Sequence, residues 1–162
     1  MVIIFCGVPG SGKSTIAKIL VEKLKERGKV EFLVSDEIRG KRYSQIYRWL
    51  RENLDRADYL IVDATFYKKE WREKVKEIAN GKNVFIIFLY CSLKTCLERN
   101  RQRKPSFPDR VIHIINAEMD ATRPPPSRKS GPLPEKPDIS IDTDKIQPEG
   151  AVSQILNKLK RR

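Results

Sequence analysis

Residues 2–15 read VIIFCGVPGSGKST, and they specify a strand, a glycine-rich loop and the start of a helix. Residues 2–6 form a continuous apolar run that breaks at Gly7, as a parallel strand buried on both faces does. The loop that follows has the spacing G-x-x-x-x-G-K-[ST], and an amphipathic helix is expected from Ser14 to about Arg27. Such a loop, placed between a strand and a helix, turns its backbone N–H groups around a phosphate. The stretch therefore predicts a nucleotide phosphate site.

The residues of this loop have distinct expected roles toward ATP and Mg²⁺. Side chains at Gly10 and Gly12 would obstruct the turn and the approach of the phosphate. Lys13 should reach the β- and γ-phosphates, and the Ser14 hydroxyl should ligate Mg²⁺. A glycine-rich turn that binds nothing is the alternative, and the flanking strand and helix argue against it. The expected ATP-binding residues are Gly7, Pro9, Gly10, Ser11, Gly12, Lys13, Ser14 and Thr15.

Two aspartates follow predicted strands and compete for the metal and base roles. Asp63 ends the buried run YLIVD, and Asp36 follows a strand predicted over residues 30–34. Ligands of open α/β sheets bind at the carboxyl ends of the strands, so both can join Ser14 at the metal. Asp36 can also accept the proton of an acceptor hydroxyl while Arg39 holds a nearby anion. The alternatives are a helix cap at Asp36 with a solvated Arg39, and a strand-end cap at Asp63.

Two arginines near the middle of the chain are candidates for charge stabilisation. Arg99 and Arg103 are one helical turn apart, so they are expected to share a face just before Lys104-Pro105, where the helix must end. An arginine brought over the γ-phosphate can be worth about 10³–10⁵ in rate. A solvated basic face is the alternative interpretation. We include both arginines among the expected catalytic residues, which are Lys13, Asp36, Arg39, Arg99 and Arg103.

The chain of 162 residues fits one α/β domain, and its 40% hydrophobic content supports a packed core. No apolar run approaches the roughly 20 residues of a membrane span, and the apolar start is too short for a signal peptide. Three cysteines without a Cys-x-x-Cys predict neither a disulfide framework nor a zinc site. The composition thus favours a soluble, cytoplasmic protein.

Five apolar runs alternate with amphipathic segments, which predicts a parallel sheet covered by helices on both faces. The expected strands are residues 2–6, 30–34, 58–62, 84–90 and 139–142. Six of the ten prolines fall between Pro124 and Pro137, interleaved with basic residues. No helix can cross that stretch, which is either a surface crossover or a mobile basic segment near a substrate, and we favour the crossover. We expect a single domain over residues 1–162, with a lid at about 99–122 and this basic crossover at about 123–137.

Several motifs together resemble a known family. The glycine-rich loop, Asp36-x-x-Arg39, the run VDATFY at residues 62–67 and Arg99-x-x-x-Arg103 resemble the kinase domain of archaeal L-seryl-tRNA(Sec) kinases. The chain is also similar to adenylyl-sulfate kinases. This resemblance implies a P-loop NTPase fold, three-layer α/β/α, with a five-stranded parallel sheet and a small helical lid. It also implies that Lys13 and Ser14 bind ATP and Mg²⁺, that Asp36 is base or metal partner, that Arg39 holds the acceptor, and that Arg99 and Arg103 belong to the lid.

The net charge of +12 bears on the acceptor. Such an excess attracts phosphate-rich partners, although a solvated, lysine-rich surface of a heat-adapted protein is the alternative. We expect a phosphotransferase that moves the γ-phosphate of ATP to a hydroxyl of an anionic acceptor, with tRNA or another RNA as a candidate partner. Two alternatives stay open: an adenylyl-sulfate kinase, and an RNA-binding factor switched by ATP hydrolysis.

Overall fold

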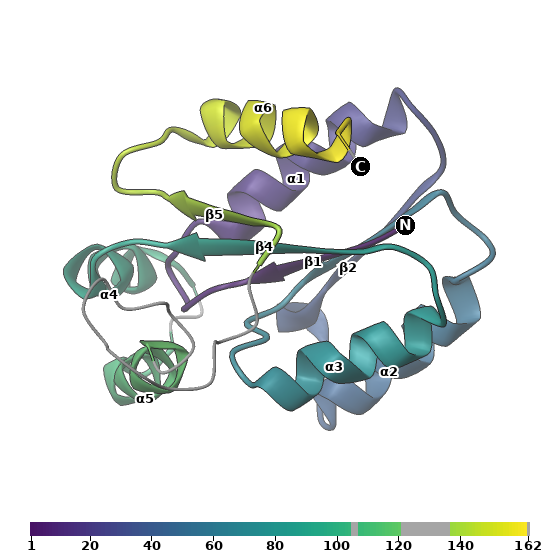
Figure 1. Cartoon of the computed structure of the whole chain (residues 1–162). Coiled ribbons are helices and arrows are strands. Elements are labelled where there is room, and N and C mark those ends of the chain that lie inside the picture. Colours follow the sequence, from purple (N-terminus) through teal and green to yellow (C-terminus); the bar gives the residue numbers. More distant parts are fainter. Residues whose placement is uncertain (105–106, 121–136, 162) are drawn as a thin grey trace, which may run out of the picture.

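The computed structural model of the chain describes residues 1–104, 107–120 and 137–161 (Figure 1). Five parallel strands form one sheet in the order β2-β3-β1-β4-β5. The strands are β1 (Val2–Cys6), β2 (Val30–Val34), β3 (Tyr59–Asp63), β4 (Val84–Tyr90) and β5 (Ile139–Asp142). The predicted five-stranded parallel sheet is therefore confirmed. The predicted crossover at 123–137 lies, except for its last residue, outside the described residues.

Helices cover both faces of the sheet, and two more lie beyond its carboxyl end (Figure 1). One face carries α1 (Lys13–Lys25) and α6 (Pro148–Leu159), and the other carries α2 (Arg42–Asn53) and α3 (Lys69–Ala79). The remaining helices, α4 (Leu93–Gln102) and α5 (Asp109–Asp120), lie where the arrowheads of β4 and β5 point. This is the predicted three-layer α/β/α arrangement. None of the helices in the described ranges is long and apolar enough to cross a membrane.

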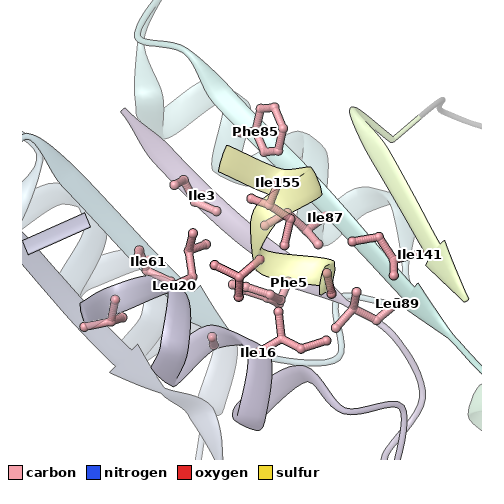
Figure 2. Packing of buried hydrophobic residues seen from close by; sticks show 14 of the residues in the cluster. Ile3, Phe5, Ile16, Leu20, Ile61, Phe85, Ile87, Leu89, Ile141 and Ile155 are labelled. Atoms are coloured by element: carbon pink, nitrogen blue, oxygen red, sulfur yellow. The ribbon is translucent and has the colours of Figure 1, made fainter. Parts of the chain in front are cut away.

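Strand β1 is buried on both faces because its side chains alternate between the two helical layers. Ile3 and Phe5 pack against Ile16 and Leu20 of α1 and Ile155 of α6, as Figure 2 shows. The neighbouring side chains, Val2 and Ile4 among them, point into the second core, under α2 and α3. Complete burial of the strand fixes the point at which the chain leaves the sheet after Cys6.

The register of the central strands brings three chain segments to one edge. Phe5 of β1 lies opposite Asp63 of β3, which in turn lies opposite Val34 of β2. The glycine-rich loop, the 3₁₀ turn η1 (Ser35–Glu37) and the residues after Asp63 therefore emerge side by side. Strand β1 is also where the order of connections reverses, the position at which open α/β sheets bind ligands.

Candidate nucleotide and acceptor site

The glycine-rich loop has the tight backbone that its sequence predicts. Gly10 and Gly12 adopt φ values of 87° and 90°, a left-handed conformation that side chains disfavour. A Cβ at Gly10 would also lie 2.2 Å from the carbonyl oxygen of Cys96 in α4. The loop is thus packed directly on α4, and only glycine fits at position 10.

Replacing Gly10 by alanine should destabilise the protein more than the same change at a matched glycine. Left-handed strain costs about 1–2 kcal/mol, and the clash with Cys96 adds a further overpacking term of about 1–3 kcal/mol. Gly81 is the control, because its φ is 84° and nothing lies within 4 Å of the added Cβ. Thermal unfolding should show a clearly larger fall in Tm for Gly10→Ala than for Gly81→Ala. Equal shifts would contradict the close packing of the loop on α4.

The Lys13 ammonium lies inside this loop. The residue is only 7% exposed, and its Nζ donates to the carbonyl oxygens of Gly7 at 2.8 Å and Val8 at 3.0 Å. Burial lowers the pKa of Lys13, while the negative charges of Asp63 and Asp36 oppose that shift. A buried cation facing two carboxylates and ringed by backbone is suited to a multiply charged anion.

A buried hydroxyl in the same loop bears on whether a phosphate fits. The Ser11 hydroxyl is fully buried and has no hydrogen-bond partner within the part of the chain that the structure describes. An unsatisfied buried polar group costs about 1–3 kcal/mol. Together with the positive-φ glycines and the enclosed Lys13, this hydroxyl makes the loop a fit for the phosphates of a nucleotide.

One pocket brings together most of the predicted catalytic and metal-binding residues. Lys13, Ser14, Asp36, Asp63 and Arg103 line it, and each was expected at the site from the sequence. They come from α1, η1, β3 and the end of α4, segments that the strand register places at the carboxyl edge. The full lining is Pro9, Lys13, Ser14, Ser35, Asp36, Asp63, Ala64, Thr65, Arg103 and Phe107.

The two carboxylates of the pocket have different surroundings. Asp63 is 4% exposed and lines the pocket together with Ser14; burial raises the pKa of Asp63, while the Lys13 charge and the Ser14 side chain oppose that change. The Asp36 carboxylate is a third exposed and forms an ion pair with Arg103 at 2.5 Å. Asp36 lies in the 3₁₀ turn, and α2 begins only at Arg42, so Asp36 does not cap that helix. A hydroxyl beside a buried carboxylate is a donor set suited to Mg²⁺.

Arg99 and Arg103 do not share a helical face. Helix α4 ends at Gln102, and Arg103 has an extended backbone (φ −91°, ψ 154°), so the one-turn spacing no longer applies. Arg103 turns into the pocket, with its guanidinium 5.2 Å from the centre of the Phe107 ring. Arg99 instead donates to the side chain and the carbonyl oxygen of Thr143, both at 3.0 Å. The prediction of a shared face was wrong because α4 ends at Gln102, one residue before Arg103.

Two further predicted residues stand apart from this pocket. Arg39 is exposed and does not belong to the lining; its carbonyl oxygen accepts from the Gln45 side chain at 2.6 Å. Thr15 is also exposed, one residue beyond Ser14 in α1. Of the predicted lid at 99–122, the structure describes the parts that form α4 and α5. Asn100 of α4 pairs with both backbone groups of Phe107, at 2.7 and 3.0 Å, and so fixes that residue at the pocket.

Sequence reasoning did not assign a role to Thr65 or Phe107, which also line the pocket. Thr65 stands two residues after Asp63, so its position behind a buried strand was a usable signal. Phe107 had no such signal, because it reaches the pocket only through its pairing with Asn100.

Comparisons with known proteins show to which family the chain belongs. The family model described as "AAA domain" matches residues 2–125. The chain is 29% identical to the L-seryl-tRNA(Sec) kinase of Methanococcus maripaludis, over 96% of this chain and 65% of that protein. It is also 29% identical to the adenylyl-sulfate kinase of Thermodesulfovibrio yellowstonii, over 98% of this chain and 83% of that protein. The resemblance that the motifs predict is thereby confirmed.

A solved structure shows the same fold. Chaetomium thermophilum Kti12, in complex with ADP-AlF3, superposes with a TM-score of 0.75 at 18% identity, over 99% of this chain and 98% of that chain. The likeness extends over nearly the whole of both chains, so the two chains share the three-layer α/β/α fold. The chain spans less than two thirds of the length of the curated L-seryl-tRNA(Sec) kinases that it matches.

Proposed function

The chain belongs to the AAA domain family, and from this premise we propose that it transfers the γ-phosphate of ATP to a hydroxyl of an anionic acceptor. The observation that carries the proposal is that Lys13, Asp36, Asp63 and Arg103 line the same pocket. Phosphoryl transfer needs little covalent chemistry from the protein, so positioning and charge stabilisation suffice. The relatives named above are kinases of the same fold.

Each charged residue of the pocket has a role in this proposal. Lys13 binds the β- and γ-phosphates, because its ammonium already lies within the glycine-rich loop. Asp36 accepts the proton of the acceptor hydroxyl, and Arg103, which pairs with Asp36 in this structure, moves onto the γ-phosphate. Arg39 and Arg99 lie outside the lining. Arg39 then contacts the acceptor outside the pocket lining. Arg99 supports the glycine-rich loop through Thr143, which donates to the Ser11 carbonyl oxygen at 3.2 Å.

The same proposal assigns Mg²⁺ to Ser14 and Asp63. These two residues both line the pocket, and Mg²⁺ in kinases is commonly held by one or two protein oxygens together with phosphates. When bound, the ion neutralises charge that develops between the β- and γ-phosphates. Asp36, paired with Arg103, is left for the acceptor.

Transfer of label from [γ-³²P]ATP tests this function and identifies the acceptor class. The chain would be offered unfractionated tRNA with and without attached amino acid, adenylyl sulfate, free serine, and no acceptor. Label in tRNA supports an RNA-directed kinase, and label in adenylyl sulfate or serine supports a small-molecule kinase. Free phosphate alone, stimulated by RNA, would contradict phosphotransfer and favour a switch driven by ATP hydrolysis.

Salt should separate an RNA acceptor from a small one. If several of the chain's excess cations contact RNA phosphates, log K for tRNA should fall with log salt by about one unit per phosphate contact. We expect a slope steeper than about −3 for tRNA, measured by filter binding between 50 and 300 mM KCl. Adenylyl sulfate, which offers few charges, is the comparison and should give a shallow slope. A flat response for tRNA would contradict direct RNA contact.

A further inference from the structure

The turn after β3 is held in place from three sides. The carbonyl oxygen of Thr65 accepts the N–H of Gly7, the first residue of the glycine-rich loop, at 3.1 Å. Buried Arg72 of α3 donates to the carbonyl oxygens of Phe66 at 2.6 Å and Tyr67 at 3.2 Å. From α2, the Tyr43 hydroxyl contacts both the backbone N–H of Phe66 and the side chain of Thr65. The turn is therefore tied to the loop and to two helices.

This turn also contains backbone strain. Phe66 is fully buried and has a φ of 40°, a left-handed value that a bulky residue rarely adopts. Such a conformation costs on the order of 1–3 kcal/mol and persists only where surrounding contacts hold it, commonly at functional sites. The strained residue directly follows Thr65, which lines the pocket together with Asp36.

The hydrogen bonds at Tyr43 determine how the Thr65 hydroxyl is oriented. The Phe66 N–H donates to the Tyr43 oxygen at 3.1 Å, so that oxygen already acts as an acceptor. Burial raises the pKa of Tyr43, which keeps its phenol protonated. The 3.2 Å contact between the two hydroxyls is compatible with either donor. If Thr65 donated, the part-buried Tyr43 proton would have no acceptor within the described chain, so Tyr43 is the donor and Thr65 the acceptor. Within the described chain, the Thr65 hydroxyl proton then has no other acceptor.

We propose that Thr65 binds the phosphate acceptor, donating its hydroxyl proton to an acceptor oxygen in the pocket that Asp36 also lines. Tyr43 is the positioning residue, because it occupies the Thr65 oxygen and so directs the Thr65 proton away from the turn. This assignment rests on the proposed phosphotransfer. It requires an acceptor oxygen that can lie beside the Thr65 hydroxyl; in the absence of any other acceptor, a water molecule held there by Thr65 takes that place and ATP is hydrolysed slowly.

Variants that differ by single hydroxyls test the assignment. Thr65→Val keeps the shape of the side chain and removes the donor, Thr65→Ser keeps the donor, and Tyr43→Phe keeps the ring that stacks on Trp71 at 3.7 Å. Tyr47→Phe is the matched control, because it removes a phenol hydroxyl from the same helix, where that hydroxyl donates to the Trp71 carbonyl oxygen. The readouts are transfer from [γ-³²P]ATP to unfractionated tRNA and to adenylyl sulfate, hydrolysis without acceptor, and Mg·ATP affinity from a fluorescent analogue.

We expect Thr65→Val to lower kcat/KM for the acceptor, or the hydrolysis rate, about tenfold, which is the loss typical of one hydrogen bond. The affinity for Mg·ATP should stay within about twofold of the wild-type value. Thr65→Ser and Tyr47→Phe should remain near wild type. Tyr43→Phe should lose several-fold activity, and the Tyr43→Phe/Thr65→Val double variant should have the activity of Thr65→Val alone, because the effect of Tyr43 on the acceptor passes through the Thr65 hydroxyl.

Any of three results would overturn the assignment of Thr65 without contradicting the proposed function. These are wild-type activity in Thr65→Val, a loss in Thr65→Ser equal to that in Thr65→Val, or additive losses in the double variant. A merely structural role of Tyr43 predicts such additivity together with a lower Tm. A wild-type chain that binds Mg·ATP but neither transfers nor hydrolyses phosphate would overturn the proposed function, and this assignment with it.

Discussion

Alanine at position 13 is expected to lower kcat/KM for phosphotransfer by about 10²–10³, the loss that follows removal of one preorganised charge-stabilising donor. Lys13 is 7% exposed and its ammonium lies among the carbonyl oxygens of Gly7 and Val8, so no neighbouring cation can take its place without rebuilding the loop. The loss should fall on the chemical step and on nucleotide binding together. Transfer from [γ-³²P]ATP and the affinity for Mg·ATP measure the two parts.

Lys18→Ala is the matched control for this change. Lys18 belongs to the same helix and is exposed, so its removal should leave both readouts unchanged and alter Tm little. The Tm of Lys13→Ala must stay close to that of the wild type for the comparison to concern catalysis. A folded Lys13→Ala protein with full transfer would show that the loop does not bind the reacting phosphates.

The fold was predictable because its decisive signals are local. A five-residue apolar run followed by a glycine-rich loop specifies a buried strand, a turn and a helix without reference to distant residues. Alternation of four further runs with amphipathic segments then leaves few arrangements other than a parallel sheet between helices. The order of the strands also follows a rule, since β1 sits at the reversal point where the loop binds its ligand.

The parts of the site that the sequence misplaced depend on where one helix ends. Arg99 and Arg103 have helical spacing, but α4 stops at Gln102 and Arg103 leaves it in an extended conformation. That single change of backbone sends one guanidinium to Asp36, 67 residues away in the sequence, and leaves the other on Thr143. Helix ends are set by tertiary contacts as well as by local sequence, so spacing alone could not separate the two arginines.

Thr65 and Phe107 escaped prediction for a related reason. Each lines the pocket because distant side chains hold its backbone: Tyr43 and Arg72 hold the turn around Thr65, and Asn100 holds Phe107. A residue with positive φ, such as Phe66, carries no signal in the sequence because its conformation is disfavoured locally and maintained by packing. Residues that act through such contacts become visible only in the folded chain.

Asparagine at position 36 is expected to lower kcat by about 10²–10⁴ while the fold and the affinity for Mg·ATP are retained. The amide keeps the shape of the carboxylate and one oxygen for Arg103, but it cannot accept the proton of the acceptor hydroxyl. Single-turnover transfer from [γ-³²P]ATP isolates that step. Glu37→Gln is the matched control, because the adjacent carboxylate is exposed and does not line the pocket, so its neutralisation should leave the rate unchanged.

The Mg²⁺ dependence of Asp36→Asn and Asp63→Asn decides between a base and a metal ligand at Asp36. Asp63, which lines the pocket with Ser14 and is almost fully buried, is assigned to the metal, so Asp63→Asn should raise the Mg²⁺ concentration that gives half-maximal transfer. Asp36→Asn should lower the maximal rate without moving that midpoint. A shifted midpoint in Asp36→Asn, with the rate restored at high Mg²⁺, would transfer the metal role to Asp36; full activity of a folded Asp36→Asn protein would remove it as the base.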